Sequence, residues 1–281
     1  MTPTYWPLTG VELSDRDLFT IARLVYEKTG IHLHEGKRAL VAARLQKRLR
    51  RGGFRSFRQY VRYVQSDATG DELTAMLDAI ATNHTAFFRE PRHFEYLAST
   101  VLPPLVAGGR PIRGWSAGCA TGEEAYTIAI VLLERLGPDA RRRASLLASD
   151  LSTKALAAAT SGVYAEARLQ DVPALLAQRY FTPAPGGSRG WWSVVPEVRA
   201  LIDFRQLNLL DVAVPGPPLD FIFCRNVMIY FDRDVQQRVV RGLEQRLAPG
   251  GYLFVSHSES LSSTTHGLTW VAPSVYRRVP R

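Results

Sequence analysis

Hydrophobic residues recur at helical spacing through the first 90 residues. Ser14 precedes such a run, and Gly30 closes it, so the pattern predicts a helix between these two residues. The same spacing predicts three further helices, and no strand-like alternation interrupts them. These helices cover about 37–51, 57–66 and 71–81. The chain therefore begins with a small all-helical domain, which we place at residues 1–88.

From Pro111 the pattern changes to strands that alternate with helices. This alternation indicates an α/β domain, at 89–281, with a mostly parallel sheet and helices on both faces. Residues 164–207 break the alternation with the turn-rich PAPGGSRG and two short strands, and we interpret them as an inserted β-hairpin region. The predicted strands are 112–118, 144–150, 219–226 and 252–257, and the predicted helices are 123–136, 152–161 and 234–247.

Composition narrows the protein class. The chain has 281 residues, of which 46% are hydrophobic, and it contains no uninterrupted run of about 18 apolar residues, so we expect no membrane insertion. Its first residues lack the basic and apolar regions of a secretory signal. Two cysteines cannot form a disulfide framework or a Cys-rich zinc site. We therefore expect a cytoplasmic protein, and a monomer.

The net charge of +9 is local. Residues 36–66 hold ten basic residues and no acidic one, whereas the rest of the chain holds 25 basic and 26 acidic residues. Helical spacing places four of the basic residues on the face opposite the apolar one. Such a patch indicates an acidic partner, either nucleic acid, a membrane surface or an acidic protein. The four residues are Arg44, Lys47, Arg48 and Arg51.

The first strand of the α/β domain leads into the glycine-rich turn SAGCATGEE. This turn has neither the spacing of a dinucleotide-binding loop nor the lysine of a phosphate-binding loop. Gly118 and Gly122 would let the backbone approach a ligand closely, and Glu123 and Glu124 suit a cation or a hydroxyl-bearing ligand. The alternative is a tight turn whose acidic residues favour the helix dipole.

Asp150 ends the second strand, where an acidic residue typically accepts hydrogen bonds from ribose hydroxyls. The alternative is a helix cap, a role that Ser152 could fill instead. Together with the glycine-rich turn, Asp150 favours an adenosine-containing ligand.

Polar residues also follow the buried strand LDFIFC and occupy the domain boundary. Arg225 and Asn226 must sit at the strand's end, where α/β enzymes place their chemistry, and Tyr230 follows them. Tyr230 could equally be a core aromatic residue. The boundary segment ATNHTAFFREP could build the wall of a cleft or simply end a helix. Cys224 reads as a small buried residue, because no histidine is placed by sequence to activate it.

The histidines give little. His32 and His34 alternate, but no carboxylate or cysteine cluster accompanies them, so we expect no metal site. His257, at the end of a predicted strand, is a secondary candidate for the active site.

Five motifs in order resemble the CheR-type chemotaxis protein methyltransferases. They span about residues 75–262 and read TNHTAFFREPRHF, WSAGCATGEEAYTIAI, ASDLSTKAL with SGVY, DFIFCRNVMIYF, and LAPGGYLFVSHSES. The resemblance implies an S-adenosylmethionine (SAM)-dependent enzyme that methylates chemoreceptor glutamates to γ-methyl esters and releases S-adenosylhomocysteine. It also implies a helical domain before a seven-stranded Rossmann-like sheet, with the cofactor between them.

The same resemblance assigns roles to individual residues. Asn83, Thr85 and Arg89 would contact the cofactor, as would one or both of Glu123 and Glu124. Asp150 would hold the ribose, Asn208 and Leu209 would flank the adenine, and Arg225 and Asn226 would lie near the methionine moiety. Arg89 and Tyr230 resemble the residues near the transferred methyl. His84 stands where the family commonly has other residues, a departure that we expect to be neutral.

The implied reaction agrees with the residues. A glutamate side chain, with an unperturbed pKa of about 4.3, is already ionised at neutral pH and can attack a sulfonium methyl without a general base. The site must then supply alignment. The basic helix becomes a docking face for the receptor's cytoplasmic helical bundle, and the β-hairpin region a possible dock for a receptor tail peptide by strand addition. The alternatives are a nucleic-acid methyltransferase and a non-catalytic adaptor that binds the cofactor. The resemblance favours the receptor over nucleic acid.

Overall fold

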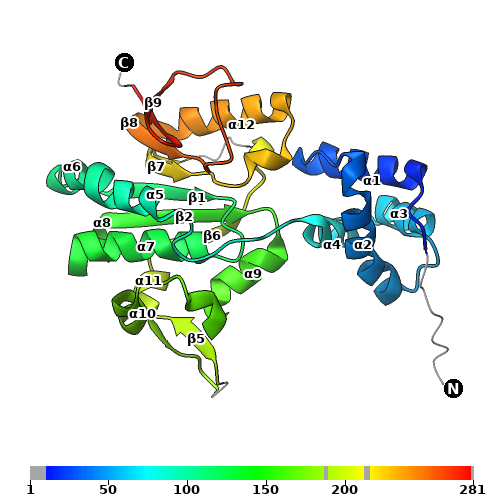
Figure 1. Ribbon diagram of the computed structural model, residues 1–281, viewed down its shortest axis with the longest axis horizontal. Coiled ribbons are helices and arrows are strands. Elements are labelled where there is room, and N and C mark those ends of the chain that lie inside the picture. The colour runs from blue at the N-terminus through cyan, green and yellow to red at the C-terminus, as the bar shows by residue number, and fades with distance from the viewer. Residues whose placement is uncertain (1–10, 187–188, 212–215, 280–281) are drawn as a thin grey trace. The chain divides into compact units, whose positions relative to one another are not determined.

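The chain folds into two compact units, Met1–Thr82 and Asn83–Arg281. The computed structural model, shown in Figure 1, describes residues 11–186, 189–211 and 216–279. The division between Thr82 and Asn83 lies somewhat before the boundary predicted at residue 88.

The first unit consists of the predicted helices. The side chain of Ser14 caps α1 by accepting from the backbone N–H of Asp17, and Gly30 ends the helix in the left-handed conformation at φ 73°. Apolar residues from all four helices form one core, so the helical periodicity is confirmed. The helices are α1 (Asp15–Thr29), α2 (Arg38–Gly52), α3 (Phe57–Ser66) and α4 (Asp71–Ile80), with a 3₁₀ turn η1 (Glu35–Lys37) before α2.

The second unit is built on a seven-stranded sheet in the order β6-β2-β1-β7-β8-β10-β9. The first five strands in this order, β6, β2, β1, β7 and β8, run parallel to one another. Strand β10 pairs antiparallel with both β8 and β9. The predicted fold class, a Rossmann-like sheet after a helical domain, is therefore confirmed. The strands are β1 (Ile112–Ala117), β2 (Ala144–Asp150), β6 (Ile202–Gln206), β7 (Leu219–Phe223), β8 (Leu247–Phe254), β9 (Leu268–Ala272) and β10 (Val275–Arg278).

Helices cover both faces of this sheet. Along β7, Phe221 and Phe223 enter one hydrophobic cluster, and Ile222 enters the other, as the alternation of a strand requires. Helix α7 packs on the first face and α12 on the second (Figure 1). The helices are α5 (Pro91–Tyr96), α6 (Leu102–Ala107), α7 (Glu123–Leu136), α8 (Ala140–Arg143), α9 (Thr153–Ser161), α11 (Pro196–Arg199) and α12 (Arg233–Arg246). Shorter turns are η2 (Leu97–Val101), η3 (Gly137–Asp139), η5 (Leu209–Asp211) and η6 (Met228–Tyr230).

A small antiparallel sheet, in the order β3-β5-β4, forms the insertion. It contains β3 (Val163–Ala165), β4 (Phe181–Pro183) and β5 (Trp191–Val194), with η4 (Glu166–Leu169) and α10 (Ala174–Tyr180) between the first two strands. The structure departs from the prediction at β6, which we had included in the insertion but which pairs with β2 in the main sheet. Residues 187 and 188 of the PAPGGSRG turn lie outside the described residues.

Among the described residues, no helix combines the length and the apolar character needed to cross a bilayer.

Candidate active site

Four neighbouring strands bring the predicted site residues to one edge of the main sheet. Strands β6, β2, β1 and β7 are adjacent and parallel, so their carboxyl ends meet at the same edge. Asp150 ends β2, Arg225 and Asn226 follow β7, and Asn208 follows β6. The glycine-rich turn follows β1. This is the edge at which open α/β sheets bind ligands.

The glycine-rich turn is fixed by its neighbours. The N–H groups of Gly118 and Cys119 donate to the carbonyl of Ser149 at 2.8 and 2.9 Å. Gly118 has a φ of 86°, and a Cβ on it would lie 2.4 Å from a methyl group of Val227. This glycine therefore lets the turn pack against the loop after β7.

Asp150 is held by the backbone on both oxygens. Its Oδ2 accepts from the N–H of Ala120 at 2.8 Å, and its Oδ1 accepts from the N–H of Ser152 at 2.9 Å. The cap of α9 is Ser152, whose hydroxyl accepts from the N–H of Ala155. The carboxylate is therefore fixed at the sheet edge, where an acidic residue at the end of this strand typically accepts hydrogen bonds from ribose hydroxyls.

The two adjacent glutamates at the start of α7 have different surroundings. Glu123 is fully buried, where the hydroxyl of Thr121 donates to it at 2.7 Å and Arg168 forms an ion pair with it. Arg168 also donates to the carbonyl of Thr85 at 3.0 Å. Glu123 thus anchors the segment before α5. Sequence reasoning missed Arg168, which lies in the insertion.

Glu124 lies toward Arg225 instead. Its Oε1 accepts from the hydroxyl of Ser116 at 2.8 Å, and its Oε2 lies 3.2 Å from Nη1 of Arg225. Burial raises the pKa of Glu124 above its usual value, and Arg225 opposes this rise. Of the two glutamates, Glu124 is the one that the structure ties to the residues after β7.

Arg225 bridges three segments of the second unit. Besides Glu124, its Nη2 donates to the carbonyl of Arg89 at 2.5 Å and lies 3.1 Å from Oε2 of Glu90. Its guanidinium lies over the ring of Phe94, 5.4 Å from the centroid. The side chain of Arg225 is 1% exposed. It therefore holds the surrounding segments in place and is not accessible to solvent.

Asn226 is positioned by a glutamate that sequence reasoning missed. Asn226 has a left-handed φ of 59°, and its side-chain amide donates to the hydroxyl of Ser256 at 2.7 Å. Glu259, from the loop after β8, accepts four backbone N–H groups, those of Asn226, Val227, Met228 and Ser256, at 2.8–2.9 Å. One buried carboxylate therefore ties the end of β8 to the loop after β7.

Arg89 and Tyr230 are both half-buried. Nη1 of Arg89 donates to the carbonyl of His84 at 3.0 Å, and within the described part of the chain Arg89 forms no ion pair. Tyr230 ends η6, where its backbone N–H donates to the carbonyl of Val227. In the part of the chain that the structure describes, no hydrogen bond joins Arg89 to Tyr230.

The remaining predicted contacts have distinct surroundings. Thr85 is buried and Asn83 is half-buried at the start of the second unit. Asn208 accepts from the N–H of Leu210 through its side-chain oxygen at 3.0 Å, which fixes the turn after β6. Leu209 is buried in the hydrophobic cluster under α12.

The surroundings of the two cysteines disfavour a role as nucleophile. Cys119 and Cys224 are both buried, and burial raises the pKa of each thiol well above its usual value, so the thiolate form is disfavoured. The interpretation of Cys224 as a small buried residue is confirmed.

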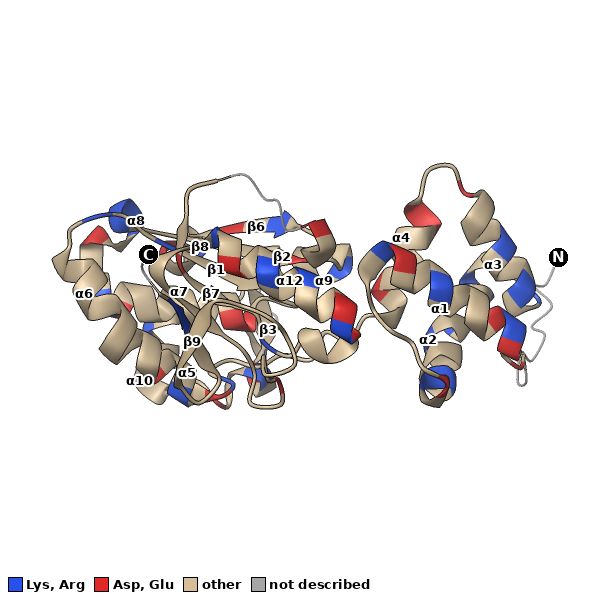
Figure 2. Ribbon diagram, turned by 90° about the horizontal axis from the view of Figure 1, so that it is seen from above, with Lys and Arg blue, Asp and Glu red and all other residues tan. Residues whose placement is uncertain are grey.

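The basic face of α2 is only partly exposed. Arg48 forms an ion pair with Glu72, at 2.5 Å, and the hydroxyl of Tyr60 donates to the same carboxylate. Arg44 donates to the backbone at the end of α4. Lys47 and Arg51 are exposed. Two of the four predicted docking residues therefore hold the helical unit together, which the periodicity alone could not reveal; Figure 2 shows the basic segments of this unit.

Comparisons with known proteins give the family. The model of the CheR methyltransferase SAM-binding domain matches residues 83–276, and that of the CheR methyltransferase all-alpha domain matches residues 16–81. The chain is 42% identical to chemotaxis protein methyltransferase 2 of Pseudomonas aeruginosa, over 92% of both chains. It is 40% identical to the chemotaxis protein methyltransferase of Escherichia coli, over 94% of this chain and 91% of that protein. The chain therefore belongs to the CheR methyltransferase family and is a SAM-dependent methyltransferase.

Proposed function

We propose that this protein transfers methyl groups from SAM to glutamate side chains of chemoreceptors and so forms glutamate 5-O-methyl esters. The substrate is the cytoplasmic helical bundle of the receptor, and the modification serves adaptation in chemotaxis or a similar pathway. Relatives that are named chemotaxis protein methyltransferases match this chain over at least nine-tenths of its length, which supports the proposal.

The donor set at the sheet edge fits SAM. Asp150 presents a fixed carboxylate suited to ribose hydroxyls. Glu124 presents a second carboxylate beside Arg225, suited to the ammonium of the methionine moiety. Because Glu123 is fully buried under Arg168, we assign the contact with the cofactor to Glu124. Asn83, Thr85, Asn208, Leu209 and Asn226 complete the proposed cofactor site.

The observation that most supports a carboxylate substrate concerns Arg89. This arginine has no acidic partner among the described residues, although Arg225 nearby has two. A half-buried cation without a counter-ion suits an incoming anion. We propose that Arg89 orients the glutamate carboxylate and that the hydroxyl of Tyr230 donates a hydrogen bond to it.

Methyl transfer from SAM to a carboxylate requires few further groups from the protein. Bound SAM supplies a methyl group activated by its sulfonium. The glutamate carboxylate is ionised at neutral pH, so the chain's residues need only align it and exclude water. Two buried thiols that resist ionisation are compatible with a site that forms no covalent intermediate.

The exposed basic residues of α2 are the proposed docking face for the receptor. Lys47 and Arg51 remain accessible, whereas Arg44 and Arg48 hold α4. Such a face would attract the acidic receptor bundle and would do so less at high salt. The docking role therefore rests on Lys47 and Arg51.

A second contact with the receptor is proposed at the insertion. An apolar groove of about 790 Å³ follows the edge strand β4 and is lined by Phe181, Pro183 and Trp192, among others. An extended receptor tail could add to β4 as a strand. Titration with receptor tail peptides should then show saturable binding, and substitution of Phe181 should weaken it.

Transfer of labelled methyl groups tests the proposed function. The protein is incubated with methyl-labelled SAM and either a receptor cytoplasmic fragment or RNA. We expect base-labile label on the receptor alone, and Arg89→Ala and Tyr230→Phe should each lower methyl transfer by a larger factor than they lower SAM affinity. Label on RNA would overturn the proposal, and full activity of both variants would remove these residues from it.

A further inference from the structure

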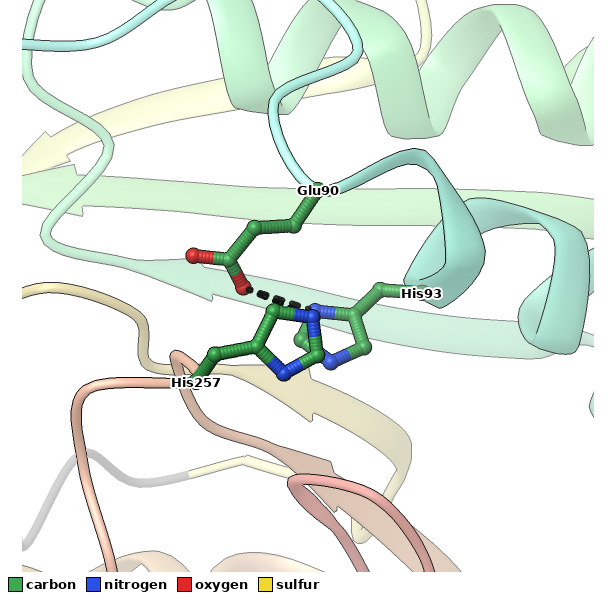
Figure 3. Close-up of side chains that lie close together, drawn as sticks. All are labelled: Glu90, His93 and His257. Carbon is green, nitrogen blue, oxygen red and sulfur yellow. Dashed lines mark ion pairs between the residues drawn. The ribbon is translucent and has the colours of Figure 1, made fainter.

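Three side chains in the second unit converge although they are distant in the sequence. Glu90 precedes α5, His93 lies in α5, and His257 lies in the loop after β8. Figure 3 shows their side chains turned toward one another. Oε2 of Glu90 lies 3.4 Å from Nδ1 of His93 and 3.9 Å from Nε2 of His257. The centroids of the two imidazole rings are 4.9 Å apart.

His93 is 1% exposed, and its ring nitrogens form no well-directed hydrogen bond, although the backbone of Pro273 and the carboxylate of Glu90 lie beside it. A buried polar group without a partner is unfavourable, by a free energy comparable to a lost hydrogen bond. Oε2 of Glu90 is likewise buried, and its contacts are ion pairs, with Arg225 at 3.1 Å and with the two histidines. Nδ1 of His93 and Oε2 of Glu90 therefore face one another at 3.4 Å, and a bound cation would satisfy both atoms.

The outer contacts of two of the three side chains, His257 and Glu90, match those of metal ligands. Nδ1 of His257 lies 3.2 Å from the hydroxyl of Ser274, so its Nε2 is left toward Glu90. Oε1 of Glu90 accepts from the hydroxyl of Ser256 at 2.9 Å, which leaves Oε2 for the cluster. Metal-binding histidines and carboxylates commonly have their second atom fixed in this way.

The charge state also suits a cation. One ionised carboxylate and two neutral imidazoles form an anionic ligand set, and these are the forms that bind metals. Nη2 of Arg225 lies 3.1 Å from Oε2 of Glu90, so its positive charge opposes a second cation there. The carboxylate of Glu124 also pairs with Arg225 and partly offsets that charge.

We infer that Glu90, His93 and His257 form a binding site for Zn²⁺. Two imidazoles and one carboxylate form a common ligand set for this ion, with water as the fourth ligand. Tetrahedral bonds of about 2.1 Å would separate the ligand atoms by roughly 3.4 Å. The three ligand atoms lie within 4.8 Å of one another, so small side-chain movements toward the ion complete the geometry. The side chain of His257 is 48% exposed, which provides the path of entry.

The two cysteines do not compete for this ion. Both thiols are buried, and burial disfavours their metal-binding thiolate form. Zinc binding by the folded protein would therefore report on the histidine cluster.

The test uses full-length protein without a histidine tag, freed of metal with a chelator. Zn²⁺ is titrated in competition with a chromophoric chelator, and Co²⁺ is added as a spectroscopic probe. We expect one site per chain and the intense visible absorption of tetrahedral Co²⁺. His257→Gln and Glu90→Gln should each weaken Zn²⁺ binding at least about tenfold. Because His257 is half-exposed, its variant should fold normally, which circular dichroism verifies.

His32→Gln is the matched control, because it removes an exposed histidine in the first unit. It should leave Zn²⁺ affinity unchanged. The inference is overturned if the wild-type chain binds no Zn²⁺ at micromolar concentration, or if the His257 and Glu90 variants bind it as tightly as the wild type.

Discussion

The carboxylate of Glu259 is expected to hold the loop after β7 in place, and Glu259→Gln tests this. Each of its oxygens accepts two backbone N–H groups. Glutamine keeps one oxygen and replaces the other with a donor, so two N–H groups lose their acceptor. A hydrogen bond to a charged group contributes about 1.5–3 kcal/mol, so the two losses should lower the free energy of unfolding of the second unit by roughly 3–6 kcal/mol.

Urea unfolding followed by tryptophan fluorescence measures this loss. Four of the five tryptophans, including buried Trp115, lie in the second unit, so the signal reports on that unit. Glu95→Gln removes the same charge from an exposed position of α5 and should change stability by less than about 0.5 kcal/mol. Because Glu259 also holds Asn226, SAM affinity of the folded variant should fall. A loss of stability below about 1 kcal/mol would refute the reasoning.

Three further predictions concern other parts of the molecule. Arg48→Ala should destabilise the helical unit by about 2 kcal/mol, because its partly buried ion pair is lost, whereas exposed Lys47→Ala should leave its thermal unfolding unchanged and raise the KM for receptor. Gly118→Ala should destabilise the second unit more than Gly53→Ala destabilises the first; both have positive φ, but only Gly118 would place its Cβ against a neighbour, and equal losses in urea unfolding would contradict this. Hydrogen bonds from Thr69 and from the N–H of Glu72 lower the pKa of Asp67, so its contribution to stability is present above its unfolded pKa and is lost as the pH falls through its folded value. Asp67→Asn should flatten that acid dependence in unfolding experiments, and an unchanged pH profile would contradict the assignment.

Local signals made the helical unit predictable. Ser14 and Gly30 mark the two ends of α1 through hydrogen bonds to residues a few positions away. The spacing of the apolar residues in α2 predicts which face of that helix is buried. The sequence does not state what the opposite face touches. Arg44 and Arg48 therefore read as a solvated surface, although they bind α4 and Glu72.

The strands of the main sheet were easiest to predict where the sequence is continuously apolar. All five residues of β7 are buried, and its run of bulky apolar residues predicts a buried strand. The sequence places β6 in the insertion because this strand follows the turn-rich PAPGGSRG and the short strand before it. Its pairing with β2 in the main sheet depends on the fold of the intervening segment.

The candidate site was predicted at residues that follow strands, because parallel strands bring their carboxyl ends together. Asp150 and Arg225 are of this kind. Glu259 and the cluster of Glu90, His93 and His257 were missed as partners, since only tertiary structure brings them together.

Identification of the methylated residue tests the central claim most directly. A receptor cytoplasmic fragment is incubated with SAM and the protein, and its peptides are analysed by mass spectrometry before and after mild base. We predict single methyl groups on glutamate side chains that are lost in base, and far fewer of them with Arg89→Ala. Methyl groups that survive base, or that lie on residues other than glutamate, would contradict the account.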